Sequence, residues 1–324
     1  MTHSDRQVVG FFNPRNSCFL NSSVQLLLSV TPLSQLCETA STPFLSALRE
    51  AKRASQSSDL LRPNSHMWHC VELFVGYSPR ALMQHDAFEF LMFFCANLDE
   101  ELPKRTHKEA ESDGWSEVSD GRHRAQATQS SHYGSSVLYS LLGLTIRHEY
   151  HVIGSQKTIR VIQEDLMTCV DAGESLERGF EELLSDSAVE DYKDDGVAVR
   201  CKRSGKIEGF SPYLLVALKR FQSSGPQAAK IDTFVAFPQR LNIPSRLLTP
   251  TLSLSVTSGQ HPPASYSLVG FLIHHGMSLS QGHYTSVIHT QGRWLSVDDQ
   301  RIQPVESTWV RRQKAYVLLY VHSD

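Results

Sequence analysis

A cysteine at the start of a helical pattern is the side chain in this sequence best suited to nucleophilic chemistry. Cys18 follows the turn-forming run Asn13-Pro-Arg-Asn-Ser17 and precedes apolar residues at helical spacing, with Ser17 as the expected N-cap. A helix N-terminus favours a thiolate, because its N–H groups are unsatisfied and its dipole is positive there. Most cysteines are nevertheless buried structural residues. A catalytic Cys18 therefore needs a base, a residue that orients the base, and donors for an oxyanion.

The best candidate for the base is His283, which opens a strand-like run after a glycine-containing loop. The strand-like runs on either side of Gln291-Gly292 predict a hairpin. If these two residues form a two-residue turn, Asp298 shares the face of His283 and Asp299 points the other way; a three-residue turn would reverse this. The parity favours Asp298 as the acceptor that orients His283, with Asp299 in a supporting role. Taken alone, the Asp-Asp pair would more often be a solvated turn.

Asn13 is the candidate donor for an oxyanion, five residues before Cys18. Its side-chain amide carries N–H groups that can stabilise a developing negative charge. The alternative is a structural role, since asparagine in a proline-containing turn commonly serves the backbone.

Helical patterns come first in the chain and strand patterns later. Residues 18–50 and 82–102 have helical periodicity, whereas the segments from 136 onward are short and rich in branched or aromatic residues. This order predicts an α+β fold rather than alternating β/α units. Residues 103–134 are polar and charged, which predicts a disordered insertion or a long surface loop. The apolar run 211–221 predicts a strand buried on both faces.

Composition and charge restrict the function further. The net charge of −3 is too small to indicate attraction to nucleic acid or to a membrane. The six cysteines lie far apart with no CxxC pair, the N-terminal residues lack the apolar region of a signal peptide, and no apolar run is long enough to span a bilayer. We expect free thiols in a reducing compartment, cytoplasmic and/or nuclear.

Several segments, in order along the chain, resemble the conserved boxes of the ubiquitin-specific proteases, the papain-like deubiquitinating cysteine proteases. The segments are 13–25 (NPRNSCFLNSSVQ), 84–91 (QHDAFEFL), 214–221 (LLVALKRF), 266–276, 282–284 (GHY), 294, 298–299 (DD) and 315–320. Two details, the His-His-Gly before Gly-His-Tyr-Thr and the acidic run 113–118, resemble the ubiquitin-specific protease ten branch.

The resemblance implies a papain-like catalytic domain over 9–322 with three subdomains. These are a helical thumb (about 9–135, with the insertion 103–134), β fingers (about 136–212) and a β palm (about 213–322). The implied activity is a thiol-dependent hydrolase that cleaves the isopeptide bond after the C-terminal glycine of ubiquitin. The implied partners are ubiquitin and ubiquitinated proteins, and the protein is expected to be a monomer without a cofactor or metal.

The resemblance also assigns roles to single residues. It makes Cys18 the nucleophile, His283 the general base, Asp298 the triad acid and Asn13 the oxyanion donor, with Asp299 supporting. The residues expected to contact the ubiquitin tail are Asp86, Glu89, Gln84, His274, Gly282 and Tyr284.

Two departures from the family pattern leave alternatives open. Arg15 stands where the family usually has glycine, so the loop that carries Asn13 can differ in shape. The CxxC pairs that hold zinc in many family members are missing from 145–212, and Cys169 and Cys201 alone cannot form a tetrahedral site. A catalytically impaired ubiquitin-binding scaffold of the same fold and a protease for a ubiquitin-like modifier are the alternative functions.

Overall fold

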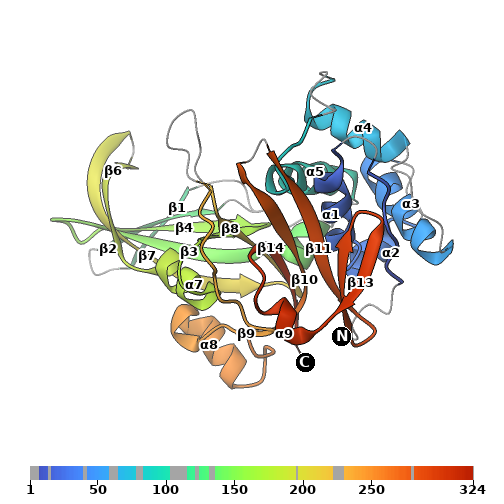
Figure 1. The fold of residues 1–324 in the computed structure, drawn as a ribbon. Coiled ribbons are helices and arrows are strands. Elements are labelled where there is room, and N and C mark those ends of the chain that lie inside the picture. The colour runs from blue at the N-terminus through green and yellow to red at the C-terminus, as the bar shows by residue number, and fades with distance from the viewer. Residues whose placement is uncertain are drawn as a thin grey trace.

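The computed structural model places helices in the first part of the chain and two β-sheets in the rest (Figure 1). It describes residues 7–13, 16–38, 42–57, 65–77, 83–102, 115–120, 124–130, 136–194, 196–221, 230–278 and 281–323.

The helical part packs around α1, whose ten residues are all buried. The helices are α1 (Cys18–Leu27), α2 (Thr31–Leu36), α3 (Pro43–Ser57), α4 (Ser65–Phe74), α5 (Ala87–Glu101) and α6 (Val137–Leu142). The apolar stripe of α5 faces α1 and α3, with edge-to-face ring contacts from Phe90 to Phe19 and from Phe94 to Phe44. This packing fixes α1, and with it Cys18, between the other helices and a sheet.

The first sheet is six-stranded and extends away from the helices (Figure 1). Its order is β1 (Trp115–Asp120), β2 (Arg124–Ser130), β4 (Thr158–Asp165), β3 (Leu144–Val152), β7 (Val197–Phe210) and β6 (Ser187–Asp194). Only the β2–β4 pair is parallel among these described strands. At the distal end, Lys157 donates to both carboxylate oxygens of Asp194 at 2.8 and 2.7 Å, and the rings of Tyr150 and Tyr192 lie 4.4 Å apart.

The second sheet has eight strands and packs against the helical part. Its order is β13 (Arg301–Val305), β12 (Arg293–Asp298), β11 (Gln281–Thr290), β10 (Ser265–Ser278), β14 (Ala315–His322), β8 (Tyr213–Lys219) and β5 (Thr168–Asp171), with β9 (Arg240–Asn242) paired to β10. The last strand among the described residues, β14, therefore lies inside the sheet, between β10 and β8.

The two faces of β8 belong to different cores, as the apolar run 211–221 predicts. Leu215 and Ala217 pack into the core shared with the helical part. Leu214, Val216 and Leu218 pack on the opposite side, in the core that contains residues of α7 (Leu176–Leu184), α8 (Pro250–Thr257) and α9 (Ser307–Val310). The second sheet is thus covered on both faces.

Two details differ from the expected organisation. The expected disordered insertion 103–134 contains strands β1 and β2, because β2 adds to the open edge of β4 and β1 pairs with β2. The other residues of this segment lie outside the described residues. Strand β5, within the range expected for the fingers, joins the second sheet by parallel pairing with β8. The side chains of Thr168 and Val170 of β5 are buried there.

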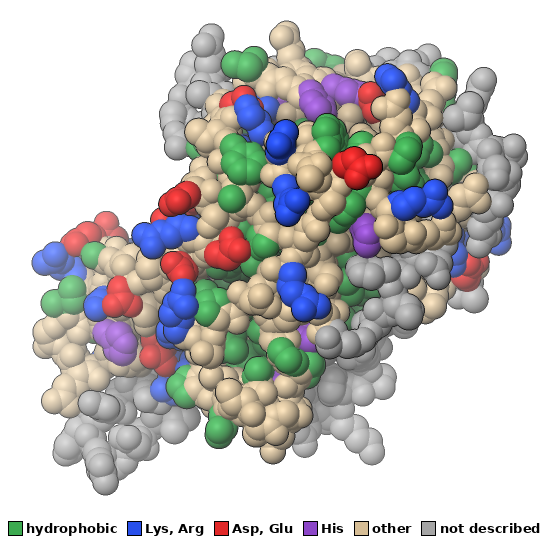
Figure 2. Space-filling model, turned by 60° about the horizontal axis from the view of Figure 1, so that its bottom comes forward, with side chains coloured by type: hydrophobic (Ala, Val, Ile, Leu, Met, Phe, Trp, Pro, Cys, Tyr) green, Lys and Arg blue, Asp and Glu red, His purple; other side chains and the backbone are tan. Residues whose placement is uncertain are grey.

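The surface carries charges of both signs. On the face shown in Figure 2, acidic and basic side chains are interspersed, in keeping with the small net charge of −3. Every helix within the described residues is too short or too polar to cross a membrane.

Candidate active site

Cys18 is the first residue of α1 and is 3% exposed. Ser17 occupies the N-cap position, but its side chain does not cap the helix: its Oγ donates to Asn13 Oδ1 at 3.2 Å. The backbone N–H of Cys18 lies in the first turn, where N–H groups have no acceptor within the helix. Cys18 thus combines a thiol with a nearby backbone donor.

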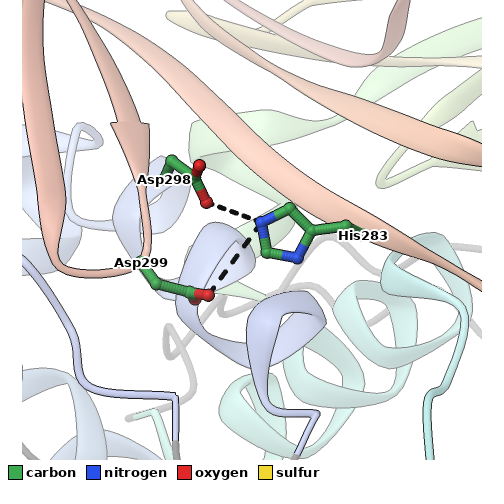
Figure 3. A group of neighbouring side chains, drawn as sticks. All are labelled: His283, Asp298 and Asp299. Carbon is green, nitrogen blue, oxygen red and sulfur yellow. Dashed lines mark hydrogen bonds and ion pairs between the residues drawn. The ribbon is translucent and has the colours of Figure 1, made fainter.

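His283 and Asp298 lie on the hairpin β11–β12, as the parity argument predicts. Thr290 pairs with Arg293, and the turn residues Gln291 and Gly292 both have positive φ (49° and 71°), as in a type I′ turn. His283 Nε2 lies 2.6 Å from Asp298 Oδ1 (Figure 3). The second ring nitrogen points away from the carboxylates in Figure 3 and is the one left for Cys18.

The surroundings of His283 favour its cationic form. Its hydrogen bond with Cys18 is the largest cause that raises the pKa of His283 to about 9, and the hydrogen bond with Asp298 adds to it. Burial acts in the opposite direction. A histidine between a thiol and a carboxylate can carry the proton of the thiol while the carboxylate stabilises the imidazolium.

Asp299 lies closer to His283 than the sequence predicts. Its φ of 49° turns the chain directly after β12, so its carboxylate does not point to the opposite face. Asp299 Oδ2 is 4.0 Å from His283 Nε2 (Figure 3). Its two oxygens accept hydrogen bonds from the side-chain amides of Asn13 and Asn21, each at 2.8 Å. These two amides hold Asp299 beside the histidine, while Asp298 makes the short contact.

Asn13 is held on both sides of its amide group. Its Oδ1 accepts the backbone N–H of Ser17 at 2.8 Å, and its Nδ2 donates to Asp299, 286 positions away in the sequence. An amide nitrogen has two N–H donors, so the second one is left for an oxyanion. Arg15, whose effect on this loop the sequence leaves open, lies outside the described residues.

Three of the predicted substrate-binding residues lie close together beside His283 on β11: Gln84, Gly282 and His274. Gln84 Oε1 accepts the N–H of Gly282 at 2.9 Å, while Gln84 Nε2 and both ring nitrogens of His274 have no hydrogen-bond partner among the described residues. Burial, with Lys230 as a further cause, lowers the pKa of His274 to about 4. A Cβ on Gly282 would lie 2.3 Å from His274 Nε2, so only glycine allows this close approach. Gln84 and His274 therefore have polar nitrogens that no described residue binds.

Asp86 does not occupy the position expected for a residue that binds arginine. It is 6% exposed, caps α5 by accepting the N–H of Glu89 at 2.9 Å, and accepts hydrogen bonds from Tyr284 (3.2 Å) and Tyr316 (2.8 Å). Its contact with a ligand would require these phenols to move, so the structure does not support the predicted role. Tyr284 is likewise buried and holds Asp86. Glu89 is exposed, and its predicted contact stays a prediction.

Two residues near the site were not singled out from the sequence. Asn21 follows Cys18 by three positions, a helical spacing that places both on one face of α1 and provides the missing signal. Lys230 binds backbone oxygens at the end of β10, a contact without a local sequence signal.

The side chains of His283, Asp298 and Asp299 could also supply ligands to a metal ion, since one donor atom from each lies within 4.8 Å of the others. The hydrogen bonds made by these groups fit a protease triad better, because Asp299 already accepts two amide N–H groups and His283 contacts Cys18. We therefore interpret the cluster as catalytic.

Comparison with known families gives one match that spans most of the chain. The family model described as "Ubiquitin carboxyl-terminal hydrolase" matches residues 9–320. Similar curated proteins include ubiquitin carboxyl-terminal hydrolase 24 of Arabidopsis thaliana, which is 28% identical over 96% of this chain and 64% of its own length. Ubiquitin hydrolase B of Dictyostelium discoideum is 26% identical over 77% of this chain and 58% of its own length. Ubiquitin carboxyl-terminal hydrolase 10 of Xenopus tropicalis is 23% identical over 97% of this chain and 47% of its own length. The chain thus spans less than two thirds of the length of these relatives.

Solved structures share the fold. A chain of the SAGA DUB module of Ubp8, Sgf11, Sus1 and Sgf73 bound to monoubiquitin matches with a TM-score of 0.73 at 18% identity, over 100% of this chain and 71% of that one. The same module bound to ubiquitin aldehyde matches with a TM-score of 0.70 at 18% identity, over 100% of this chain and 72% of that one. The expected α+β fold is confirmed.

Proposed function

Because the chain belongs to the ubiquitin carboxyl-terminal hydrolase family, we propose that it is a cysteine-type deubiquitinase. It would cleave the isopeptide bond between the C-terminal glycine of ubiquitin and a substrate lysine. The observation that carries this proposal is the position of His283, which hydrogen-bonds Cys18 from α1 on one side and Asp298 from β12 on the other.

In the first step, the sulfur of Cys18 attacks the glycine carbonyl carbon and a C–S bond forms. The carbonyl oxygen becomes an oxyanion, which the second N–H of Asn13 Nδ2 and the backbone N–H of Cys18 stabilise. The C–N bond then breaks, and the lysine amine leaves with the proton of the His283 imidazolium. A thioester between ubiquitin and Cys18 remains.

In the second step, His283 takes a proton from a water molecule, whose oxygen attacks the thioester carbon. The C–S bond breaks and releases Cys18 as thiolate and the C-terminal carboxylic acid of ubiquitin, which loses its proton to solvent and leaves as a carboxylate. Asp298 stabilises the imidazolium in both steps through its 2.6 Å contact with Nε2. Asp299 acts through Asn13, whose amide it holds.

The proposal is tested with ubiquitin that carries a C-terminal electrophile. The wild-type protein should be labelled covalently, and Cys18→Ala should abolish labelling, whereas a substitution at the half-buried Cys169 should not. Folded wild-type protein that binds ubiquitin but neither labels nor cleaves would contradict the proposal and favour a scaffold. Preferential labelling by a probe built on a ubiquitin-like modifier would change the substrate.

We also propose that the protein acts as a monomer in a reducing compartment, the cytoplasm or nucleus. All six cysteines are free, which supports this location. Imaging of the tagged protein and its mass in solution test the two statements. A secreted or dimeric protein would contradict them.

A further inference from the structure

The ammonium of Lys230 is buried at the end of β10, near the candidate site. Its side chain is 5% exposed, and Nζ donates to the backbone oxygens of His274 and Gly276, each at 2.9 Å. The Asp232 carboxylate lies 3.3 Å from the same nitrogen. An ammonium has three N–H donors, so each donor of Lys230 has an acceptor.

Arg220 fixes the backbone that carries Lys230. The N–H of Ile231 donates to Arg220 O at 2.6 Å, and Arg220 Nη1 donates to the backbone oxygens of Ile231 and Thr233 at 3.0 and 2.8 Å. Arg220 is 1% exposed and also donates from Nε to the oxygen of Ala315, the first residue of β14, at 2.6 Å. Lys230 therefore reaches β10 from a support that is tied to β8 and β14.

The two oxygens that Lys230 binds flank His275, and His275 lies directly opposite His283 in the β10–β11 ladder. Beyond this pair the register shifts between His275 and Ser278, so regular ladder hydrogen bonds do not fix the end of β10. Because paired residues on neighbouring strands move together, a contact that fixes the backbone around His275 also fixes the backbone of His283.

We propose that Lys230 is a positioning residue for the deubiquitinase reaction. Its ammonium fixes the end of β10 and so holds His283 beside Cys18 and His274 beside Gly282. The inference rests on the proposed function for the identity of the substrate, but not for the geometry. The ion pair with Asp232 contributes little net stability, because the Asp232 side chain is 44% exposed to solvent. Positioning is thus a better explanation of this buried charge than stability.

The first test compares Lys230→Met with Lys314→Met. Methionine keeps an unbranched apolar stem at position 230 and removes the ammonium. A displacement of about 1 Å at the reacting groups costs about 10²-fold in rate, so kcat for a fluorogenic ubiquitin substrate should fall by about that factor. KM should stay close to the wild-type value, whereas the melting temperature should fall, because the oxygens of His274 and Gly276 lose the hydrogen bonds from the ammonium. Lys314 also pairs with Asp232 but contacts neither β10 oxygen, so Lys314→Met should keep the wild-type kcat.

The second test needs no ubiquitin. Iodoacetamide alkylation of Cys18, with the rate in Cys18→Ala subtracted, reports how well His283 generates the thiolate. The groups that face His283 are Cys18 on α1, His274 and His275 on β10, Asp298 on β12, and Asp299 directly after β12. Lys230→Met leaves all of them in place, so slower alkylation below about pH 7 would report displacement of His283. Lys314→Met should follow the wild type.

The inference is overturned if folded Lys230→Met keeps both the wild-type kcat and the wild-type alkylation profile, or if Lys314→Met loses as much. If Lys230→Met does not fold, Lys230→Arg provides the same comparison, because a guanidinium cannot replace a compact ammonium between two carbonyl oxygens. A wild type that alkylates normally but does not process ubiquitin would refute the proposed function, while the alkylation comparison would still decide the role of Lys230.

Discussion

Replacing Asn13 by alanine tests the oxyanion site, because the contribution of Asn13 to catalysis can be separated from its contribution to stability. Loss of one oxyanion donor costs about 2.7–4 kcal/mol of transition-state stabilisation, which is about 10²–10³-fold in kcat. Asn13→Ala also loses the 2.8 Å hydrogen bonds to Ser17 N and from Nδ2 to Asp299. At about 0.5–1.5 kcal/mol for the neutral bond and about 1.5–3 kcal/mol for the bond to the Asp299 carboxylate, these two losses should lower the free energy of unfolding by about 2–4.5 kcal/mol. KM should change little, since the oxyanion exists only in the transition state and intermediate.

Steady-state hydrolysis of a fluorogenic ubiquitin amide measures kcat and KM, and urea unfolding measures stability. The matched control is Asn21→Ala, which removes the other amide donor to Asp299 at 2.8 Å but leaves the N–H groups of Asn13 in place. We expect this control to lower kcat by about tenfold or less, because it removes only an indirect hydrogen bond. If Asn21→Ala loses as much kcat as Asn13→Ala, the direct oxyanion role is refuted and the effect acts through Asp299.

Three further predictions concern pH, packing and stability. The pKa of His283 is raised to about 9, so its contribution to stability should be complete below the ordinary value of about 6.5 and lost as the pH rises through about 9; urea unfolding of wild type and His283→Gln should differ at low pH and converge above about pH 10. Gly282→Ala should lower kcat by about 10²-fold, because the new Cβ would lie 2.3 Å from His274 Nε2; a wild-type kcat would contradict the close packing. Tyr316→Phe should lower the free energy of unfolding by about 1.5–3 kcal/mol in urea, because its O–H donates to the buried Asp86 carboxylate at 2.8 Å; an unchanged midpoint would show that this bond contributes nothing.

The active-site hairpin could be predicted because its register depends on local residues. Gln291 and Gly292 are suited to the positive φ values of a tight turn, and a two-residue turn determines which residues face each other across the strands. The position of Asp298 relative to His283 then follows by counting. The same counting does not place the side chain of Asp299, because its positive φ ends the strand and changes the direction of the side chain.

The helix-capping role of Asp86 has a local signal in the sequence. An aspartate directly before a helical run, with Glu89 three positions later, is typical of a helix N-cap. The phenols of Tyr284 and Tyr316 that bury it come from distant strands, and no pattern near Asp86 indicates them. The same holds for Lys230, whose three acceptors are defined only by the folded ends of β10 and by Asp232. Contacts between distant segments could be predicted only where the residues on both sides belong to motifs of the resembled family.

The position of β14 has a consequence for how the protein becomes active during synthesis. A ribosome releases β14 (Ala315–His322) after the other strands that the structure describes, yet β14 lies between β10 and β8 and joins the two parts of the second sheet. Until β14 emerges, β10 lacks its neighbouring strand on the β14 side. The β11–β12 hairpin, which follows β10 in the sheet, is then not held in place, and Cys18 on the early helix α1 lacks the proposed base His283. Domains generally fold as units once their residues are available. A growing chain should therefore remain unable to hydrolyse ubiquitin conjugates around the ribosome, and shortened chains that lack β14 should be inactive and prone to degradation.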